Sequence, residues 1–196
     1  EKSNLGMATD QCEYIDLSFV SEKTSEKTIS YTNVSGKRKQ VTTSYKQNVL
    51  TFAEGDYTLD VVFRVYNDGY SFRYNIRKDG ENDGEFTVTD ELTHFALPEN
   101  AKTYAMAVVT NVGVLGGGAY YSYEDKYQYR SYKNLGDEQL GFPVLYSVQS
   151  GDSEIYSLIS ESDIYGHDYH GSALQKDGND GLKTIHMPAC GTDASM

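Results

Sequence analysis

A turn motif between two alternating apolar segments is the feature that most restricts the fold of this chain. Asn67-Asp68-Gly69 separates two stretches in which every second residue is apolar. These turn residues supply the positive φ that a tight hairpin needs, and alternation with period two places the apolar side chains on one face of a strand. The apolar positions are Leu59, Val61, Phe63 and Val65 before the turn and Phe72, Tyr74 and Ile76 after it. The stretch therefore predicts an antiparallel β-hairpin.

Similar short segments recur along the chain and predict an all-β fold. Strands are expected at 14–19, 29–33, 41–45, 85–95, 104–114, 141–148 and 154–160, with turn residues between them. Helical periodicity is weak throughout, and the residues after Leu174 are polar and expected to be loop-like. Many short strands at this spacing predict an antiparallel β-sandwich.

Composition and net charge indicate the kind of core and the class of partner to expect. Hydrophobic residues make up only 38% of the 196 residues, but 18 Tyr and 7 Phe supply additional burial, so a core rich in aromatic side chains is expected. The net charge of −12 argues against a nucleic-acid partner and an anionic membrane surface. An acidic chain suits neutral partners such as sugars, or cations such as calcium. In the alternative, the excess negative charge serves only to keep the protein soluble. No apolar run approaches the about 18 residues of a membrane span.

A carboxylate follows a second apolar alternation in EIYSLISESDIYG, residues Glu154–Gly166. A pleat that carries Ile155 and Ile159 into a core directs Glu161 the same way, just where the strand runs out. An ionised carboxylate is unfavourable there unless a cation or a hydrogen-bond donor meets it. That group would be a metal, a substrate or a second domain. In the alternative, the strand ends at Ser160 and Glu161 lies in solvent.

Two loop histidines are the other candidate metal ligands. His167 and His170 have metal-compatible spacing, and Asp163 and Asp168 lie nearby. A third zinc ligand at the usual spacing is missing, so exposed loop histidines are the default interpretation. His94, in a predicted strand, is expected to be a hydrogen-bonded structural residue.

Other motifs remain open. Cys12 and Cys190 either pair in an oxidising compartment or stay free thiols. Asn33-Val34-Ser35 fits an N-glycosylation acceptor, and Gly116–Gly118 lacks the following helix of a phosphate-binding loop. No Ser-His-Asp arrangement and no acid–nucleophile carboxylate pair can be assigned from spacing. A tyrosine band could stack on sugar rings, or its members could be buried in a sandwich core: Tyr120, Tyr121, Tyr123, Tyr127, Tyr129 and Tyr132.

An ordered set of segments resembles the N-terminal domain of glycoside hydrolase family 97. The resemblance covers residues 3 to 174, nearly the whole chain. The segments are SNLG (Ser3–Gly6), VVFRVYNDGYSFRYNI (Val61–Ile76), ELTHFALP (Glu91–Pro98), YEDKY (Tyr123–Tyr127) and FPVLYSV through YSLISESDIYGHDYHGSAL (Phe142–Leu174).

The resemblance implies a defined architecture and activity. Members are exo-acting α-glucosidases or α-galactosidases, typically periplasmic or secreted. They carry an N-terminal supersandwich of the galactose-mutarotase-like kind, a catalytic (β/α)8 barrel and a small C-terminal β domain. An active-site calcium is bound by glutamates, one of them from the N-terminal domain in a Glu-Ala-x-Leu pattern. This pattern corresponds to Glu161-Ser162-Asp163-Ile164 here, so the resemblance assigns Glu161 as a calcium ligand. His170-Gly171-Ser172 departs from the family's usual Ala-Gly-Met.

The expected domain organisation follows. Residues 1–174 would form the sandwich, truncated at its N-terminal edge, and residues 175–196 a polar tail or linker toward a missing barrel. A (β/α)8 barrel needs about 250 residues, so the chain alone is expected to be inactive. In the parent enzyme it would pack on the barrel as an intramolecular partner, help to form the oligosaccharide pocket and donate Glu161 to calcium. The alternatives are a non-catalytic carbohydrate-binding β-sandwich module and a plain structural domain.

Overall fold

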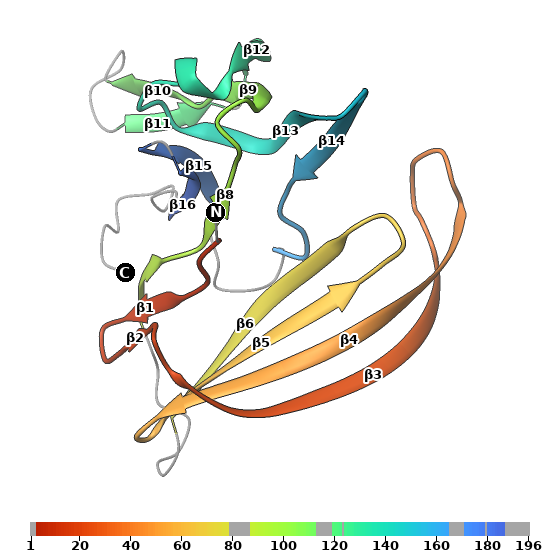
Figure 1. Cartoon of the computed structure of the whole chain (residues 1–196), viewed down its shortest axis with the longest axis vertical. Helices are drawn as coiled ribbons and strands as arrows, with labels where there is room; N and C mark the ends of the chain where they lie inside the picture. Colours follow the sequence, from red (N-terminus) through yellow and green to blue (C-terminus); the bar gives the residue numbers. More distant parts are fainter. Residues whose placement is uncertain are drawn as a thin grey trace. The chain divides into compact units, whose positions relative to one another are not determined.

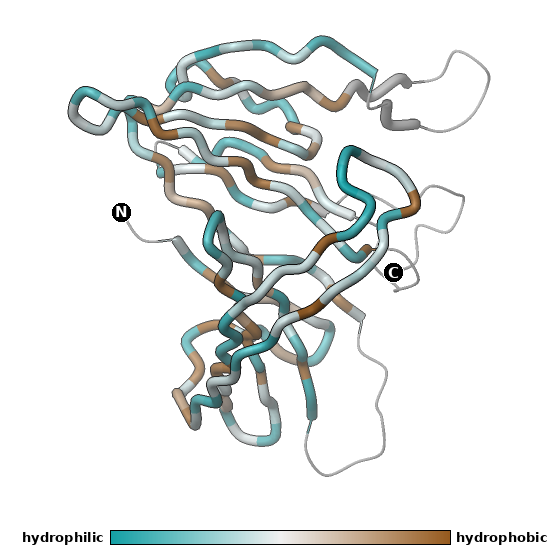
Figure 2. Tube along the Cα trace, turned by 90° about the vertical axis from the view of Figure 1, so that its right-hand side faces the viewer, coloured by the Kyte–Doolittle hydropathy of each residue, from teal (hydrophilic) through white to brown (hydrophobic). Residues whose placement is uncertain are grey.

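A computed structural model describes residues 3–78, 87–112, 119–122, 124–164, 171–178 and 180–186. In this part of the chain there are strands β1 to β16 and one 3-10 turn, η1 (Tyr132–Asn134), and all strand pairings between named strands are antiparallel (Figure 1). Hydrophobic and hydrophilic residues are interspersed along the strands (Figure 2). The predicted all-β, antiparallel sandwich class is confirmed. The described residues include no helix with the length and apolar character of a membrane span.

The chain divides into two compact units, of which the second is Tyr14–Phe86. This unit is a four-stranded sheet in the order β3 (Ser18–Thr32), β4 (Gln40–Glu54), β5 (Tyr57–Val65) and β6 (Tyr70–Lys78). The hairpin predicted around Asn67-Asp68-Gly69 is present as β5–β6, closed by the Tyr66 N–H bonding to the Gly69 carbonyl at 2.8 Å. Its strands are aligned so that Phe63 lies opposite Phe72, with ring centroids 5.8 Å apart.

A charged residue lies within the buried strand β5. Asp60 is 9% exposed, accepts a 2.8 Å hydrogen bond from the Thr51 hydroxyl and forms an ion pair with Arg77 of β6. Burial acts to raise the pKa of Asp60, but the hydrogen bonds from Arg77 and Thr51 and the Arg77 charge outweigh it. The pKa therefore lies below its ordinary value.

The first unit comprises Glu1–Glu13 and Thr87–Met196. Its large sheet has the order β12 (Gln128–Ser131), β9 (Lys102–Ala107), β13 (Leu140–Ser150), β15 (Ser172–Asp177), β16 (Gly181–His186) and β8 (His94–Ala96), with β14 (Ser153–Ile159) paired to β13. A smaller sheet has the order β2 (Glu13–Tyr14), β1 (Met7–Thr9) and β7 (Val88–Glu91), and β10 (Val109–Val112) pairs with β11 (Ala119–Ser122).

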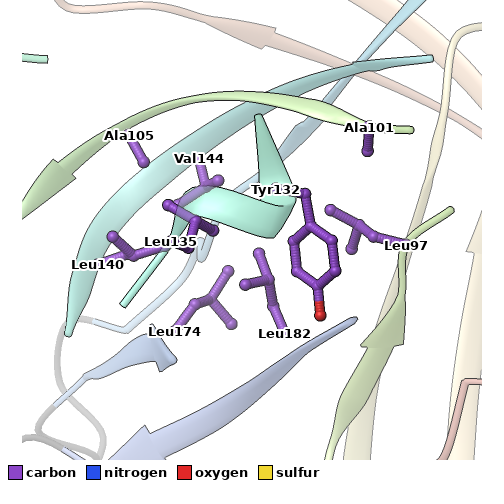
Figure 3. Packing of buried hydrophobic residues seen from close by; sticks show 9 residues of the cluster. All are labelled: Leu97, Ala101, Ala105, Tyr132, Leu135, Leu140, Val144, Leu174 and Leu182. Carbon is purple, nitrogen blue, oxygen red and sulfur yellow. The ribbon is translucent and has the colours of Figure 1, made fainter. Parts of the chain in front are cut away.

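One cluster of nine buried residues forms the core of this unit (Figure 3). Its members are Leu97, Ala101, Ala105, Tyr132, Leu135, Leu140, Val144, Leu174 and Leu182. The Tyr132 hydroxyl donates a 2.9 Å hydrogen bond to the Gly181 carbonyl, which satisfies the one polar atom that this ring brings into the core.

The loop-like character expected after Leu174 is wrong for the residues that form β15 and β16. These strands make a hairpin, and Leu182 is 0% exposed. Leu182 and Ile185, the apolar residues of β16, are three positions apart and give no period-two signal, so the sequence pattern missed a strand that the neighbouring β8 and β15 stabilise. Gly181 allows the close approach to β8, because a Cβ there would lie 2.0 Å from the Phe95 carbonyl oxygen.

Candidate carboxylate site and tyrosine patch

Glu161 lies two residues beyond the end of β14, on the face that the alternation predicted. Ser157, Ile159 and Glu161 are half-buried, whereas Tyr156 and Leu158 on the opposite face are 55% and 61% exposed. Ile159 packs against the core cluster, so the pleat does direct Glu161 to the more buried side.

The expectation that Ile155 enters a core is wrong, because this side chain is 52% exposed. Ile155 pairs with Val148 near the end of the β13–β14 hairpin. The pairing of β9 with β13 reaches only as far as Ser147, so among the described residues no third strand pairs with this end of the hairpin. Periodicity identified the face but not how far along the strand that face is covered.

Ser172, the first residue of β15, meets both carboxylate oxygens of Glu161. Its hydroxyl donates a 2.5 Å hydrogen bond to Oε1, and its backbone N–H donates one of 3.3 Å to Oε2. Gly171, with φ +84°, brings the backbone close, since a Cβ there would lie 3.7 Å from Oε2. Glu161 is therefore half-buried and oriented by hydrogen bonds, unlike the solvent-exposed carboxylate of the alternative interpretation.

The donor set fits one part of an oxygen-ligand cation site. A carboxylate oxygen has two acceptor positions, so the one bond from Ser172 to each oxygen of Glu161 is compatible with cation binding. Calcium takes about six to eight oxygen ligands. Within the residues that the structure describes, no group of three or more His, Cys, Asp or Glu could hold a metal ion. A complete site would thus need ligands from elsewhere.

The histidine and cysteine predictions have different outcomes. His167, His170 and Cys190 lie outside the described residues, as does Asp168, so the zinc alternative and the Cys12–Cys190 pairing stay predictions. His94 is buried at 8% exposure and its backbone N–H bonds to the Asn4 carbonyl at 2.9 Å. The expected hydrogen bonding of its ring is wrong for the described structure, in which neither ring nitrogen has a partner.

The tyrosine band divides between core and surface. Tyr132 is 1% exposed and belongs to the core, whereas Tyr127 and Tyr129 are 53% and 51% exposed. Tyr123 and the side chains of Tyr120 and Tyr121 lie outside what the structure describes. Both interpretations of the band therefore hold for part of it.

Strand pairing assembles a tyrosine patch that the linear sequence does not show. Tyr129 of β12 stacks on Tyr104 of β9 with ring centroids 4.4 Å apart. Across the same sheet Lys102 pairs with Ser147, which pairs with Tyr156. We define the tyrosine patch as Lys102, Tyr104, Tyr129, Glu154 and Tyr156.

The polar groups of the patch form hydrogen bonds and charge interactions with neighbouring side chains. Glu154 accepts 2.8 Å hydrogen bonds from the Ser147 and Tyr156 hydroxyls, which lower its pKa, and the nearby Lys102 charge contributes. The hydrogen bond to Glu154 raises the pKa of Tyr156. The interaction with Tyr129 raises the pKa of Lys102, whose ammonium lies 5.9 Å from the Tyr129 ring centroid. The patch thus combines exposed aromatic faces with an ammonium and a carboxylate.

Comparison with protein families matches residues 1–190 to the family described as Glycosyl-hydrolase 97 N-terminal. A search of curated proteins gives no match. Similar solved structures include a Glycoside Hydrolase Family 97 enzyme from Pseudoalteromonas sp. strain K8 in complex with panose, with a TM-score of 0.76 and 19% identity, covering 95% of this chain and 27% of that one. The acarbose complex of a family 97 enzyme from the same strain has a TM-score of 0.76, 19% identity and coverages of 96% and 27%.

A beta-arabinopyranosidase is a third similar structure, with a TM-score of 0.76, 25% identity and coverages of 96% and 30%. The chain thus spans between 27% and 30% of the length of these solved chains. The two family 97 likenesses, at 19% identity, support the fold.

Proposed function

This chain belongs to the Glycosyl-hydrolase 97 N-terminal family, and we propose that it serves a larger exo-acting α-glycosidase by donating the Glu161 carboxylate to an active-site calcium. The enzyme would be an α-glucosidase or α-galactosidase, located in the periplasm or secreted. The (β/α)8 barrel of that enzyme would supply the catalytic carboxylates and the other calcium ligands, and the sandwich would pack against it.

The observation that carries the proposal is the double hydrogen bond from Ser172 to Glu161. A carboxylate that accepts charge-assisted bonds on both oxygens has few accessible rotamers, so it is oriented before any cation arrives. Ligands of metal ions are commonly oriented by such outer partners. When bound, calcium would supply positive charge to the sugar pocket. Glu161 would hold the ion and Ser172 would orient Glu161.

The substrate is proposed to be an oligosaccharide. Two of the similar solved structures are complexes with panose and acarbose, and another is a beta-arabinopyranosidase. The arabinopyranosidase is named for a sugar other than those bound in the two complexes, while all three chains share this fold. Sugar preference would therefore come from barrel residues and not from the sandwich.

The test is Glu161→Gln in the full-length enzyme, with calcium binding measured by isothermal titration calorimetry beside hydrolysis rates. We expect calcium affinity to fall more than about tenfold, because an amide is a weaker ligand than a carboxylate and carries no charge. Asp163→Asn removes a nearby exposed carboxylate and is the matched control. Unchanged calcium affinity in E161Q would contradict the ligand role, and calcium-dependent turnover by residues 1–196 alone would contradict the need for the barrel.

A second candidate function is non-catalytic carbohydrate binding through the tyrosine patch. Tyr129 and Tyr156 expose half of their surface on one sheet face, with a carboxylate and an ammonium beside them. Tyrosine offers an apolar ring for the C–H face of a pyranose and a polar edge for its hydroxyls. This candidate is compatible with the calcium proposal, since the two use different residues.

A further inference from the structure

The far part of the β3–β4 hairpin differs in charge from the rest of the molecule. Residues 27–45, which we call the arm, contain four of the 17 Lys and Arg residues and none of the 29 Asp and Glu residues. The other residues therefore keep 13 cations and all 29 anions, a formal net charge of −16. A basic arm on an acidic chain indicates attraction to an anionic partner surface.

The arm continues beyond the other strands of its sheet. The pairing of β4 with β5 begins at Lys46, opposite Val65, whereas β3 and β4 stay paired out to Thr32 and Gln40. The arm is thus two-stranded, and Figure 1 shows it as the curved end of the β3–β4 ribbon. A two-stranded ribbon is marginally stable by itself in water, so its persistence needs either internal bonds or a covering surface.

One face of the arm is closed by polar pairs. The hydroxyls of Thr28 and Ser44 lie 2.7 Å apart, and those of Ser30 and Thr42 lie 2.8 Å apart. Thr32 donates a 3.1 Å hydrogen bond to Gln40. The polar side chains on this face therefore hydrogen-bond to each other across the two strands, which stabilises the register of the pair.

The opposite face carries the arm's exposed apolar side chains and ends in cations. Ile29 and Tyr31 are 38% and 48% exposed, and Tyr31 pairs with Val41. At the tip, the Asn33 backbone N–H and side-chain amide bond to the carbonyls of Lys39 and Arg38 at 2.8 and 2.9 Å. The tip is thereby tied by its backbone, and the side chains of Lys37, Arg38 and Lys39 remain exposed. An aromatic and aliphatic centre beside a charged rim is the composition of a protein–protein interface.

We propose that the arm docks on the acidic surface of a second copy of this chain. Charge complementarity favours this occupant, because in each copy the residues outside the arm carry a formal net charge of −16. Reciprocal docking of this kind closes a two-fold dimer in which both arms are used. The apolar face provides the contact area that becomes buried in the dimer. The cations at the tip orient the two copies and increase the association rate. The proposal goes beyond the calcium role and involves neither Glu161 nor the tyrosine patch.

Sedimentation velocity of the 196-residue chain, over a concentration series at about 50 mM and about 500 mM NaCl, tests the proposal, because screening lengths shorten over this range. The test variant is K37E/R38E/K39E, which changes three exposed side chains at the tip of the arm. The matched control K23E/R73E/K126E exchanges two Lys and one Arg at exposed positions outside the arm. Each variant changes the formal net charge from −12 to −18. Tyr31→Ser removes the exposed ring of the apolar face.

We expect a dimer whose dissociation constant rises about tenfold from low to high salt. The arm variant should weaken it by more than tenfold relative to the charge-matched control, and Y31S should weaken it at both salt concentrations. Circular dichroism melting of all variants verifies that each is folded. A monomer at every concentration overturns the proposal. So does a dimer that responds equally to both charge variants, or binding of the arm to a polyanion such as heparin without self-association.

Discussion

The Ser172 hydroxyl lies 2.5 Å from Oε1 of Glu161, and its backbone N–H lies 3.3 Å from Oε2, so one residue at the start of β15 orients the carboxylate that follows β14. The two residues are separated by eleven positions in the sequence, and six of the intervening residues, 165–170, lie outside the described structure. This relationship gives the calcium proposal its most direct test within the chain.

Ser172→Ala in the full-length enzyme is expected to weaken calcium binding about tenfold, since loss of an outer partner typically costs about 10- to 100-fold in metal affinity. The backbone N–H remains, so the loss should be smaller than in E161Q. Calorimetric titration with calcium measures the affinity. The conservative variant Ser172→Thr keeps a hydroxyl and should retain most of the wild-type affinity. Ser160→Ala is the control, because its exposed hydroxyl donates to the Glu161 backbone carbonyl and not to the carboxylate. Equal affinities for S172A and S160A would count against a positioning role.

The stability of the first unit depends on β16. Leu182→Ala is expected to lower the free energy of unfolding by about 2–5 kcal/mol, because it removes a fully buried leucine from the core. Leu158→Ala makes the same chemical change at 61% exposure and should cost less than about 1 kcal/mol. Urea unfolding followed by circular dichroism compares the two. Similar losses would show that residues 181–186 do not belong to the folded core in solution.

The Asp60–Arg77 pair predicts a pH dependence in the second unit. The pKa of Asp60 is lowered in the folded state, so its stabilising effect is present above the unfolded value and is lost as pH falls through the folded pKa. Asp60→Asn should therefore cost about 2 kcal/mol near neutral pH. The difference from the wild type should shrink progressively below about pH 4, where an unfolded aspartate binds its proton.

Urea unfolding of both proteins between neutral and acidic pH measures this effect. Asp56→Asn, an exposed carboxylate in the turn between β4 and β5, is the control and should stay within about 0.5 kcal/mol of the wild type. A difference between D60N and the wild type that does not change with pH would contradict the ion-pair explanation.

Sugar binding by the tyrosine patch is tested in the isolated chain. Tyr129→Ala and Tyr156→Ala should each weaken binding of neutral oligosaccharides by about tenfold, because an aromatic contact is worth about 1 kcal/mol beyond its buried area. Affinity electrophoresis or NMR titration with maltooligosaccharides measures this. Tyr70→Ala, 65% exposed on β6, is the matched control. Oligosaccharide affinity that is unchanged in all three variants would contradict the carbohydrate-binding function.

Local patterns predicted those parts of the fold that depend on neighbouring residues. The β5–β6 hairpin followed from a turn motif between two alternating strands, and the face of Glu161 followed from counting by two from Ile159. Ile155 has the same parity and is nevertheless exposed, because the coverage of a face depends on where the next strand ends. The strand around Leu182 carried no periodic signal of its own.

The all-β class, the main hairpin and the family could be predicted from the amino-acid sequence, since each depends on residue types at short, fixed spacings. Three contacts became evident only in the folded chain: Ser172 with Glu161, Arg77 with Asp60, and Tyr104 with Tyr129. These pairs join separate strands or loops, and which residues meet there is set by strand register. A local turn sets the register of a hairpin such as β5–β6, but the register between strands that are distant in the sequence depends on packing and hydrogen bonding across the whole sheet.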